Sequence, residues 1–230
     1  ANTFQFFDSR KAWKVLAHIS FALNHIHKNG YVHLDVSPSN ILLCQNKFLF
    51  DLFSSDKCID NTVYKLTDFG TVIKEGSFDI FSEGAGPYVS PEALQYPNSP
   101  YPVSYPTDIW SLGAVMFEIV THTPMPRNAE KYTAIRKGEI DFTSIIPPEF
   151  EIVIHNPTLR PSAEQILELP QVNEILSELQ AQIELGSYRY EQFNSDMDIS
   201  QLPAEEQNMI LSAHRRIGRQ KRFFDEDLTA

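Results

Sequence analysis

Two short polar stretches of the sequence combine acidic, amide and small side chains at close spacing. One contains His33 and Asp35, with Asn40 five residues after the aspartate, and the other contains Asp68 and Gly70. Transfer of a phosphoryl group from a nucleotide requires a carboxylate that orients and deprotonates the attacking hydroxyl, and oxygen ligands that hold Mg²⁺ against the phosphates. Asp35 suits the first task. Asn40 and Asp68 suit the second, and Gly70 lets the backbone turn sharply beneath Asp68.

Each polar stretch lies next to segments of strand-like composition. Residues 31–34 and 41–43 are short β-like runs that begin and follow the first stretch, and residues 62–66 directly precede the second. Polar and proline-containing sequence between such runs predicts turns. We therefore expect the candidate residues to lie on loops between short strands.

Helical patterns surround these strands. Apolar residues recur about every 3.6 residues from a cap at Asp8 or Ser9 to a stop at Gly30. Thr107 and Asp108 are expected to cap a helix that is apolar on nearly all sides, which is typical of the centre of a core. Irregular loops are predicted for the Gly-, Ser- and Pro-containing segments, and helices for the periodic ones. The predicted loops are 70–92 and 97–106, and the predicted helices are 109–120, 129–137, 162–169 and 172–183.

The composition is that of an ordinary globular protein. Of the 230 residues, 42% are hydrophobic and 21% are charged, which excludes collagen-like, coiled-coil and disulfide-scaffold classes. The formal net charge of −11 disfavours nucleic acid as a partner. Cys44 and Cys58 form no metal-binding motif, and no apolar run is long enough to span a bilayer. We expect an intracellular protein with no disulfide, zinc site or transmembrane segment in this chain.

The last 44 residues differ in character from the rest. Pro203 opens a second helical pattern that ends before Gly218, with basic residues over 214–222 and acidic residues over 225–227. Acids at the start of a helix and bases at its end suit the helix dipole. We expect a solvated helical tail, with a docking segment for a partner as the alternative.

Five motifs occur in the order of the eukaryotic protein-kinase signature set, and the sequence resembles that family from its start to about residue 175. They are His33-x-Asp35 with Asn40, Asp68-Phe69-Gly70, Ser90-Pro91-Glu92, Asp108-x-Trp110-x-x-Gly113 and Arg160-Pro161. The resemblance is to the large C-terminal lobe. It implies an α+β, protein-kinase-like fold that is mostly helical with short β-hairpins, with the N-terminal lobe absent from this chain. It also implies a partial kinase domain over 1–178 and a helical, charged tail over 179–230.

Carried over position by position, the resemblance implies roles for the candidate residues. Asp35 is the catalytic base, and Asn40 and Asp68 are the Mg²⁺ ligands. Ser37, which departs from the family pattern, is expected to donate a hydroxyl hydrogen bond in the cofactor-binding site. Residues 68–92 are the activation segment. The expected cofactors are ATP and Mg²⁺.

Other matches imply structural roles. Glu92 and Arg160 match a buried ion pair that ties the end of the activation segment to the lobe. Asp108 matches the carboxylate that anchors the backbone of the catalytic loop. His33 and Phe69 are expected to pack beneath the site.

Three stretches resemble the Wee type of kinase, which phosphorylates a Tyr or Thr on cyclin-dependent kinases and includes a membrane-associated branch. They are residues 32–36, 135–138 and 160–167. The resemblance implies a protein substrate with a Ser, Thr or Tyr acceptor, namely a cyclin-dependent kinase, and delay of mitotic entry as the outcome. It implies a cytoplasmic or nuclear location and leaves endomembrane association open.

The sequence departs from the kinase pattern at several positions. No glycine-rich loop or VAIK-type lysine precedes the first helix, so we expect a piece of a longer protein and little activity from this chain alone. Ser37 and Ser39 stand where many kinases have a cation, and Leu34 stands where many have an arginine that binds a phosphorylated activation segment. We therefore expect no activation of that kind by phosphorylation at Thr71 or at the serines of 77–82.

Further differences concern loops and leave an alternative function. Ala85 lacks the hydroxyl of the Gly-Thr pair that it matches, residues 47–61 resemble an inserted surface loop, and the stretch before His155 is short. The alternative is a pseudokinase that binds a cell-cycle kinase without catalysis. The retained acidic and amide residues favour the enzyme, because such groups would be costly to desolvate in a site without a metal.

Overall fold

The computed structural model describes residues 9–45, 62–77, 86–126, 129–137 and 156–181. The chain divides into two units, the first made of Ala1–Cys44 and Thr62–Leu176 and the second of Gln45–Asn61 and Ser177–Ala230. The candidate site lies in the first unit. The expectations for the inserted loop, for Ala85, for the stretch before His155 and for the tail helix fall outside the described residues.

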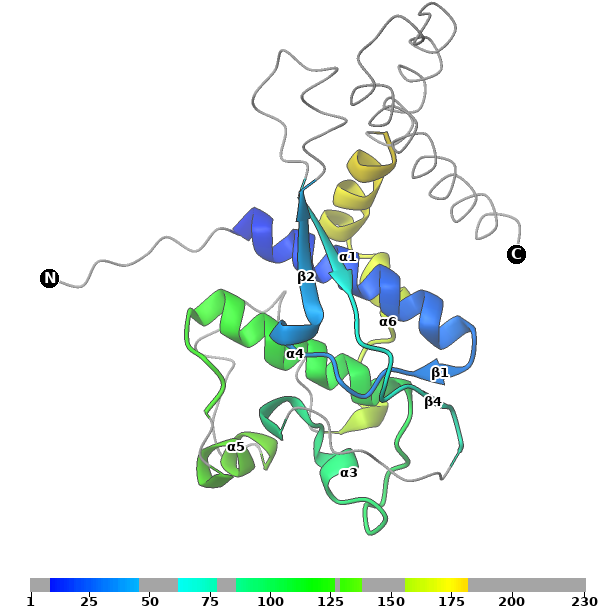
Figure 1. The fold of residues 1–230 in the computed structure, drawn as a ribbon, viewed down its shortest axis with the longest axis vertical. Helices are drawn as coiled ribbons and strands as arrows, with labels where there is room; N and C mark the ends of the chain where they lie inside the picture. Colours follow the sequence, from blue (N-terminus) through cyan, green and yellow to red (C-terminus); the bar gives the residue numbers. More distant parts are fainter. Residues whose placement is uncertain (1–8, 46–61, 78–85, 127–128, 138–155, 182–230) are drawn as a thin grey trace, which may run out of the picture. The chain divides into compact units, whose positions relative to one another are not determined.

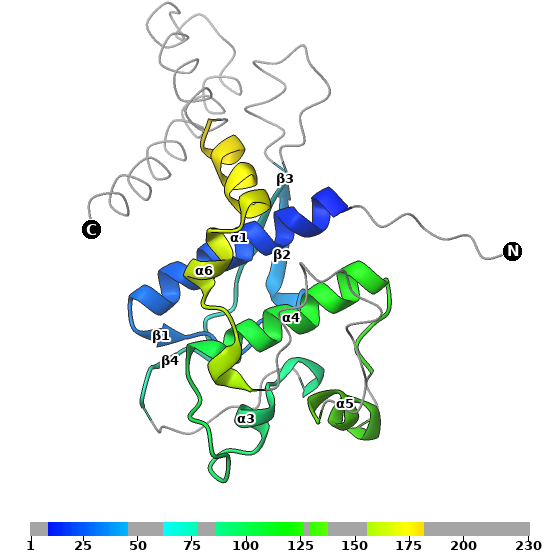
Figure 2. The same ribbon diagram turned by 180° about the vertical axis from the view of Figure 1, so that it is seen from behind.

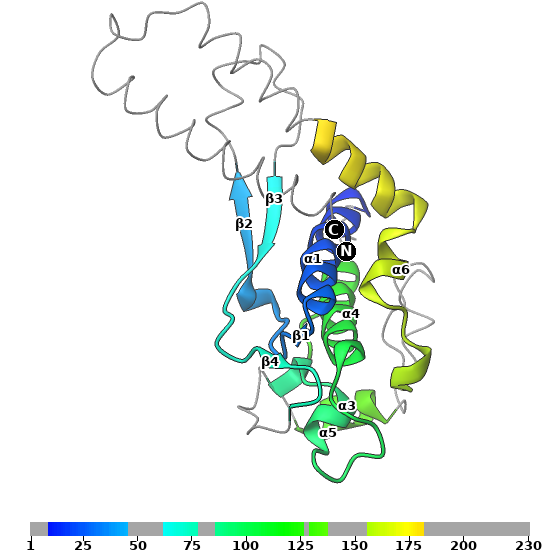
Figure 3. The same cartoon turned by 90° about the vertical axis from the view of Figure 1, so that its right-hand side faces the viewer.

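Two long helices form the centre of the first unit. α1 (Ser9–Lys28) and α4 (Tyr105–Thr121) pack against each other, and both contribute fully buried side chains to one core. α1 also lies between the β2–β3 strand pair and α6 (Ala163–Leu167), as Figures 1 and 3 show. The largest fully buried apolar side chains come from these helices and from strand β1 and the loop after it: Leu16, Ile19, Leu23, Val32, Val36, Ile109, Trp110, Leu112, Met116 and Ile166.

The two long helices begin and end at identifiable signals. α1 ends at Lys28, and Gly30 follows with a φ of 80°, which glycine adopts without strain. The start predicted for α4, residue 109, was wrong by four residues, because the helix begins at Tyr105 with Ser104 as its N-cap. The Thr107 hydroxyl accepts a hydrogen bond from the Ser104 N–H (3.3 Å), which is the partner role in a capping box. Asp108 is fully buried and is used in tertiary contacts instead.

Two pairs of short strands lie beside these helices. β1 (Tyr31–Val32) pairs antiparallel with β4 (Ile73–Lys74), and β2 (Ile41–Gln45) pairs with β3 (Thr62–Leu66). The bounds of β3 agree with the prediction. The predicted strand 31–34 was wrong in its last two residues, since the backbone N–H groups of His33 and Leu34 bind the Asp108 carboxylate instead of a strand.

Short elements complete the unit (Figure 2). They are η2 (Gly86–Tyr88), α3 (Pro91–Leu94), α5 (Ala129–Arg136) and η4 (Pro157–Leu159), with helical residues at 170–176. The segment predicted to be irregular over 70–92 thus contains β4, η2 and the start of α3. α6 begins with a capping box in which Ser162 and Gln165 exchange hydrogen bonds of 2.8 and 3.1 Å. Within the described ranges, no helix has the length and apolarity that a membrane span requires.

Candidate active site

The loop that carries Asp35 is held in place through its backbone. The N–H groups of His33 and Leu34 donate to the two carboxylate oxygens of Asp108, each at 2.8 Å. Asp108 is fully buried in the first turn of α4, so the carboxylate is fixed by the core. Leu34 has a φ of 69°, a left-handed conformation that a branched residue adopts only when surrounding contacts impose it. The core therefore sets the backbone immediately before Asp35.

A histidine that the sequence did not single out completes the Asp108 cluster. His27 Nε2 lies 2.9 Å from Asp108 Oδ2, and the His27 ring stacks on Tyr105 with centroids 4.8 Å apart. A hydrogen bond to Glu75 raises the pKa of the Tyr105 phenol above its ordinary value. No local signal marks His27, because its partner is 81 positions away.

Asn40 and Asp35 contact each other directly. Asn40 Nδ2 donates to Asp35 Oδ2 at 2.7 Å and to the Asp35 backbone carbonyl at 2.9 Å. Asn40 is 8% exposed, so its amide is held in one orientation. With Nδ2 committed to Asp35, the other end of the amide, Oδ1, is the atom that could bind a metal ion.

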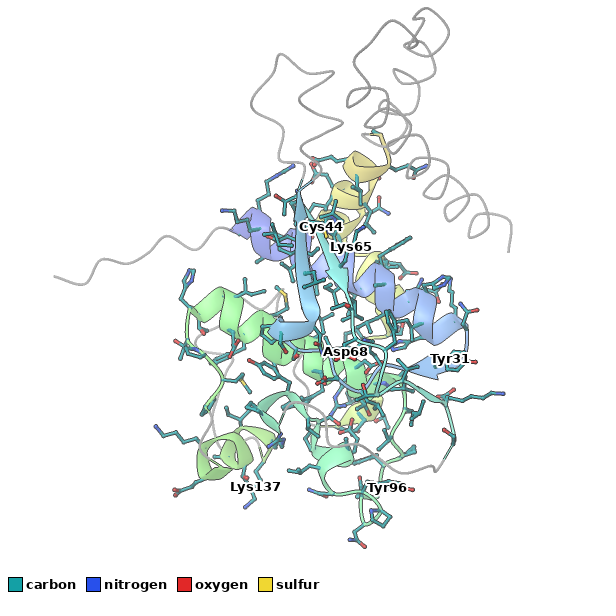
Figure 4. All side chains as sticks on the ribbon, in the orientation of Figure 1. Tyr31, Cys44, Lys65, Asp68, Tyr96 and Lys137 are labelled. Carbon is teal, nitrogen blue, oxygen red and sulfur yellow. The ribbon has the colours of Figure 1, made fainter. Side chains whose placement is uncertain are left out.

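Three contacts bring the second polar stretch against the first. The Thr67 N–H donates to the Asn40 carbonyl at 3.0 Å, and the Thr71 hydroxyl donates to the His33 carbonyl at 2.8 Å. The Phe69 ring meets the His33 ring edge-on with centroids 5.4 Å apart. The two stretches, far apart in sequence, therefore form one site. Asp68, which is labelled in Figure 4, lies in the chain between the contact residues Thr67 and Phe69.

Asp68 occupies a tight turn on an exposed part of this site. Its φ is 63°, and its Oδ1 accepts a hydrogen bond from the Gly70 N–H at 3.2 Å. A Cβ at Gly70 would lie 3.2 Å from the same oxygen, closer than most side chains tolerate. Gly70 thus leaves room for the carboxylate to fold back over its own backbone, while the left-handed residue of this turn is Asp68.

His33 is a buried histidine within the site, and its pKa is lowered. It is fully buried, and its Nδ1 accepts a hydrogen bond from the Asp35 N–H at 3.3 Å. Burial lowers the pKa of His33 below its usual 6.5, although the charges of Asp108, Asp35 and Asp68 oppose that shift.

The far end of the 68–92 segment is tied down by a buried ion pair. Arg160 Nη1 and Nη2 donate to Glu92 Oε1 and Oε2 at 2.5 and 3.0 Å, and the side chains are 0% and 1% exposed. The Thr107 hydroxyl donates to Glu92 Oε1 at 3.1 Å, and Arg160 Nη1 also donates to the Pro106 carbonyl at 2.9 Å. The pair is buried, as the resemblance implied, and the structure shows in addition that it is bidentate.

Comparison with known proteins identifies the family to which this site belongs. A protein-family model described as "Protein kinase domain" matches residues 2–172 of this chain. The chain belongs to the protein kinase family. It is 32% identical over 165 residues to the Wee1-like protein kinase of Oryza sativa subsp. japonica, covering 70% of this chain and 28% of that kinase.

Two further kinases are similar at comparable identity. The mitosis inhibitor protein kinase mik1 of Schizosaccharomyces pombe (strain 972 / ATCC 24843) is 34% identical over 137 residues, 59% of this chain and 20% of that kinase. The membrane-associated tyrosine- and threonine-specific cdc2-inhibitory kinase wee-1.3 of Caenorhabditis briggsae is 31% identical over 131 residues, 56% of this chain and 17% of that kinase. The chain therefore matches less than a third of the length of each of these three kinases.

Two residues of this kinase chain lie differently from the sequence expectation. Ser37 is 1% exposed, and its hydroxyl lies 2.8 Å from that of Ser39, so the described geometry does not present it to a ligand. Phe69 was expected to pack beneath the site but is 59% exposed. The left-handed turn at Asp68 directs the next residue outward, where the edge contact with His33 leaves most of the ring uncovered.

The donor set suits a kinase magnesium ion. The part of the chain that the structure describes contains no cluster of three or more His, Cys, Asp or Glu side chains able to hold a metal. Mg²⁺ in phosphoryl-transfer sites takes one or two protein oxygens and completes its shell with phosphate oxygens and water. The Asn40 amide oxygen and the exposed Asp68 carboxylate meet that requirement.

Proposed function

We propose that this chain is the large, mostly helical C-terminal lobe of a protein kinase that transfers the γ-phosphoryl group of ATP to a hydroxyl of a protein. The lobe would extend over residues 1–178, with residues 179–230 as a charged helical tail. The observation that carries the proposal is the joining of the two polar stretches. The contacts of Thr67 with Asn40 and of Thr71 with His33 bring Asp35 and Asp68 to one site.

In this proposal Asp35 is the catalytic base. Its Oδ2 is oriented by the Asn40 amide at 2.7 Å, and its backbone is fixed through Asp108. Asp35 takes the proton of the substrate hydroxyl as that oxygen bonds to the γ-phosphorus and ADP leaves. Positioning of a base in this way contributes about 10²–10⁴ to rate.

Asn40 Oδ1 and the Asp68 carboxylate would hold Mg²⁺. When bound, the ion neutralises the charge of the phosphate oxygens. The chain holds both ligands rigidly: Asn40 is fixed by its hydrogen bonds to Asp35, and Asp68 is fixed by its own turn. Phe69 lies exposed next to Asp68.

The proposed substrate is a cyclin-dependent kinase, and the proposed outcome is inhibition of mitotic entry. The names of the similar kinases support this assignment, since one is a mitosis inhibitor and another is cdc2-inhibitory. The stretches 32–36, 135–138 and 160–167 also resemble the Wee type. The proposal includes an intracellular location.

A binding module without catalysis is the second candidate. The Ser37 and Ser39 hydroxyls bond each other and supply no positive charge near the transferred group. Loss of one transition-state donor typically costs about 10²–10³ in rate. The direct contact of Asn40 with Asp35 favours the enzyme, because packing alone does not require it.

The test is transfer of labelled phosphate from ATP to a cyclin-dependent kinase by the intact protein, with Asp35→Asn as the control. Asparagine keeps an acceptor for the Asn40 amide but cannot take the proton. We expect the variant to lose about 10²-fold or more in kcat with unchanged thermal stability. Equal transfer by both proteins would refute the role of Asp35, and substrate binding without transfer by the wild type would favour the binding module.

A further inference from the structure

A tyrosine at the first position of α4 lies over the histidine that binds Asp108. The rings of Tyr105 and His27 stack with an interplanar angle of 28° and with centroids 4.8 Å apart. His27 is 9% exposed, whereas Tyr105 is half-buried and lies on the outer side of the pair. The Tyr105 ring therefore fixes the plane of the imidazole and shields it from solvent.

The plane of the imidazole matters because one oxygen of Asp108 serves two donors. Oδ2 accepts from His27 Nε2 at 2.9 Å and from the His33 backbone N–H at 2.8 Å, while Oδ1 accepts from the Leu34 N–H. Asp108 is fully buried, so water does not take the place of a lost donor. A displaced imidazole would shift the carboxylate that holds the backbone before Asp35.

The phenol end of Tyr105 is held by the start of the 68–92 segment. Its hydroxyl donates a hydrogen bond to the Glu75 carboxylate. The Glu75 backbone N–H donates to the Gly30 carbonyl at 2.8 Å, directly beyond the pairing of β4 with β1. Glu75 is thus fixed by its own backbone before it binds the phenol. The end of α1, the start of α4 and the residue after β4 meet at this tyrosine.

Neither Tyr105 nor Glu75 fills the core. Glu75 is exposed, and among the described residues neither side chain belongs to the apolar cluster or packs against it. Replacement of either side chain consequently leaves no cavity in the core. Their contacts instead connect the start of the 68–92 segment with the carboxylate that holds the catalytic loop.

We propose that Tyr105 is a positioning residue for Asp35 that acts through the His27 ring. By stacking on His27 it keeps the imidazole on Asp108, and its bond to Glu75 holds the ring in place. This inference rests on the proposed kinase function and adds a determinant of kcat that touches neither substrate. Because the base must meet the substrate hydroxyl within hydrogen-bond reach, a small shift of its backbone lowers the rate and leaves binding unchanged.

Paired variants separate the ring of Tyr105 from its hydroxyl. We measure kcat, KM for ATP and KM for a cyclin-dependent kinase with the intact protein. Tyr105→Phe keeps the stack and loses the bond to Glu75, so we expect kcat to fall about 3-fold. Tyr105→Leu loses both, so we expect kcat to fall about 10-fold, with both KM values changed less than about twofold. Glu75→Ala should match Tyr105→Phe, and Glu75→Gln, which keeps an acceptor, should restore the wild-type kcat.

Matched controls change the same chemical groups elsewhere on the surface. Tyr101→Phe removes an exposed phenol, and Glu164→Gln neutralises a carboxylate that is 61% exposed. Neither should alter kcat or either KM. Thermal unfolding of every variant confirms that the comparison is made between folded proteins.

Hydrogen exchange of the His33 and Leu34 amides gives a readout that does not depend on catalysis. Both amides donate to Asp108, so their exchange rates report that contact directly. We expect faster exchange in Tyr105→Leu and Glu75→Ala than in the wild type and the controls.

The two readouts distinguish the inference from the function on which it rests. A wild type that transfers no phosphate would refute the proposed function, and faster exchange in Tyr105→Leu would still support the role of Tyr105. Unchanged exchange at these two amides in a folded Tyr105→Leu, or equal changes in kcat and both KM values, would overturn the inference.

Discussion

Removal of Arg160 is predicted to destabilise the chain strongly, because it leaves a buried carboxylate without its counter-charge. In Arg160→Met, Glu92 loses both hydrogen bonds from the guanidinium and keeps the one from Thr107, while the Pro106 carbonyl loses its donor. Glu92 is 2% exposed, so water cannot replace the lost donors.

The magnitude follows from the burial of both partners. Breaking a buried ion pair by removing one partner costs about 3–5 kcal/mol. Against a typical domain stability of about 5–15 kcal/mol, this is a large fraction. For a chain of this size it corresponds to a decrease of about 6–20 °C in Tm.

The same chain offers a matched control on its surface. Lys28 Nζ lies 3.0 Å from Glu164 Oε1, but the two side chains are 60% and 61% exposed. Exposed pairs of this kind contribute about 0–1 kcal/mol. Lys28→Met is therefore expected to change the free energy of unfolding by no more than that.

Urea unfolding followed by the fluorescence of the two tryptophans, Trp13 and the buried Trp110, measures these differences. The double variant Glu92→Leu with Arg160→Met is expected to lose less stability than Arg160→Met alone, because no buried charge is left unpaired. A loss below about 1 kcal/mol for Arg160→Met, equal to that of Lys28→Met, would refute the reasoning.

Two further predictions concern the joined polar stretches. Thr71→Val keeps the side-chain shape but removes the donor to the His33 carbonyl, so we expect the free energy of unfolding to fall by about 0.5–1.5 kcal/mol and kcat to decrease. Thr71→Ser keeps the hydroxyl and should retain both the stability and the kcat of the wild type. Equal behaviour of the two variants in urea unfolding and phosphate transfer would contradict this prediction. The pKa of His33 is lowered in the folded chain, so the unfolded chain binds more protons below pH 6.5 and stability should decrease as pH falls below that value. Urea unfolding between about pH 7.5 and about pH 5.5 tests this. If the free energy of unfolding of a His33→Asn variant depends on pH in the same way as that of the wild type, His33 is not the cause.

The local patterns of the sequence predicted the elements that depend on local physics. The helix over Ser9–Lys28 and the strand over Thr62–Leu66 have strong periodicity and clear end signals, and the structure confirms both. The start of α4 was misplaced because Thr107 and Asp108 are both good cap residues. A capping-box contact to Ser104 and a tertiary role for Asp108 decided the outcome, and neither is visible in the local sequence.

The long-range contacts of the site could be inferred only where a family motif marked them. Asp108 and the Glu92–Arg160 pair were anticipated in this way, and the structure forms their contacts. His27 and Arg136 were given no contacts in advance, because their partners lie far away in sequence and a single buried histidine or arginine gives no pattern. Strand β4 was not predicted because it has only two residues, which is too short to show a periodicity.

Asp108 binds main-chain atoms of the catalytic loop rather than its side chains, and this has an evolutionary consequence. The carboxylate receives the amides of His33 and Leu34, groups that every residue except proline possesses. Side chains in this loop can consequently be exchanged while the base stays where it is. The contact of the Leu34 amide with Asp108 therefore places no demand on the chemical type of the Leu34 side chain.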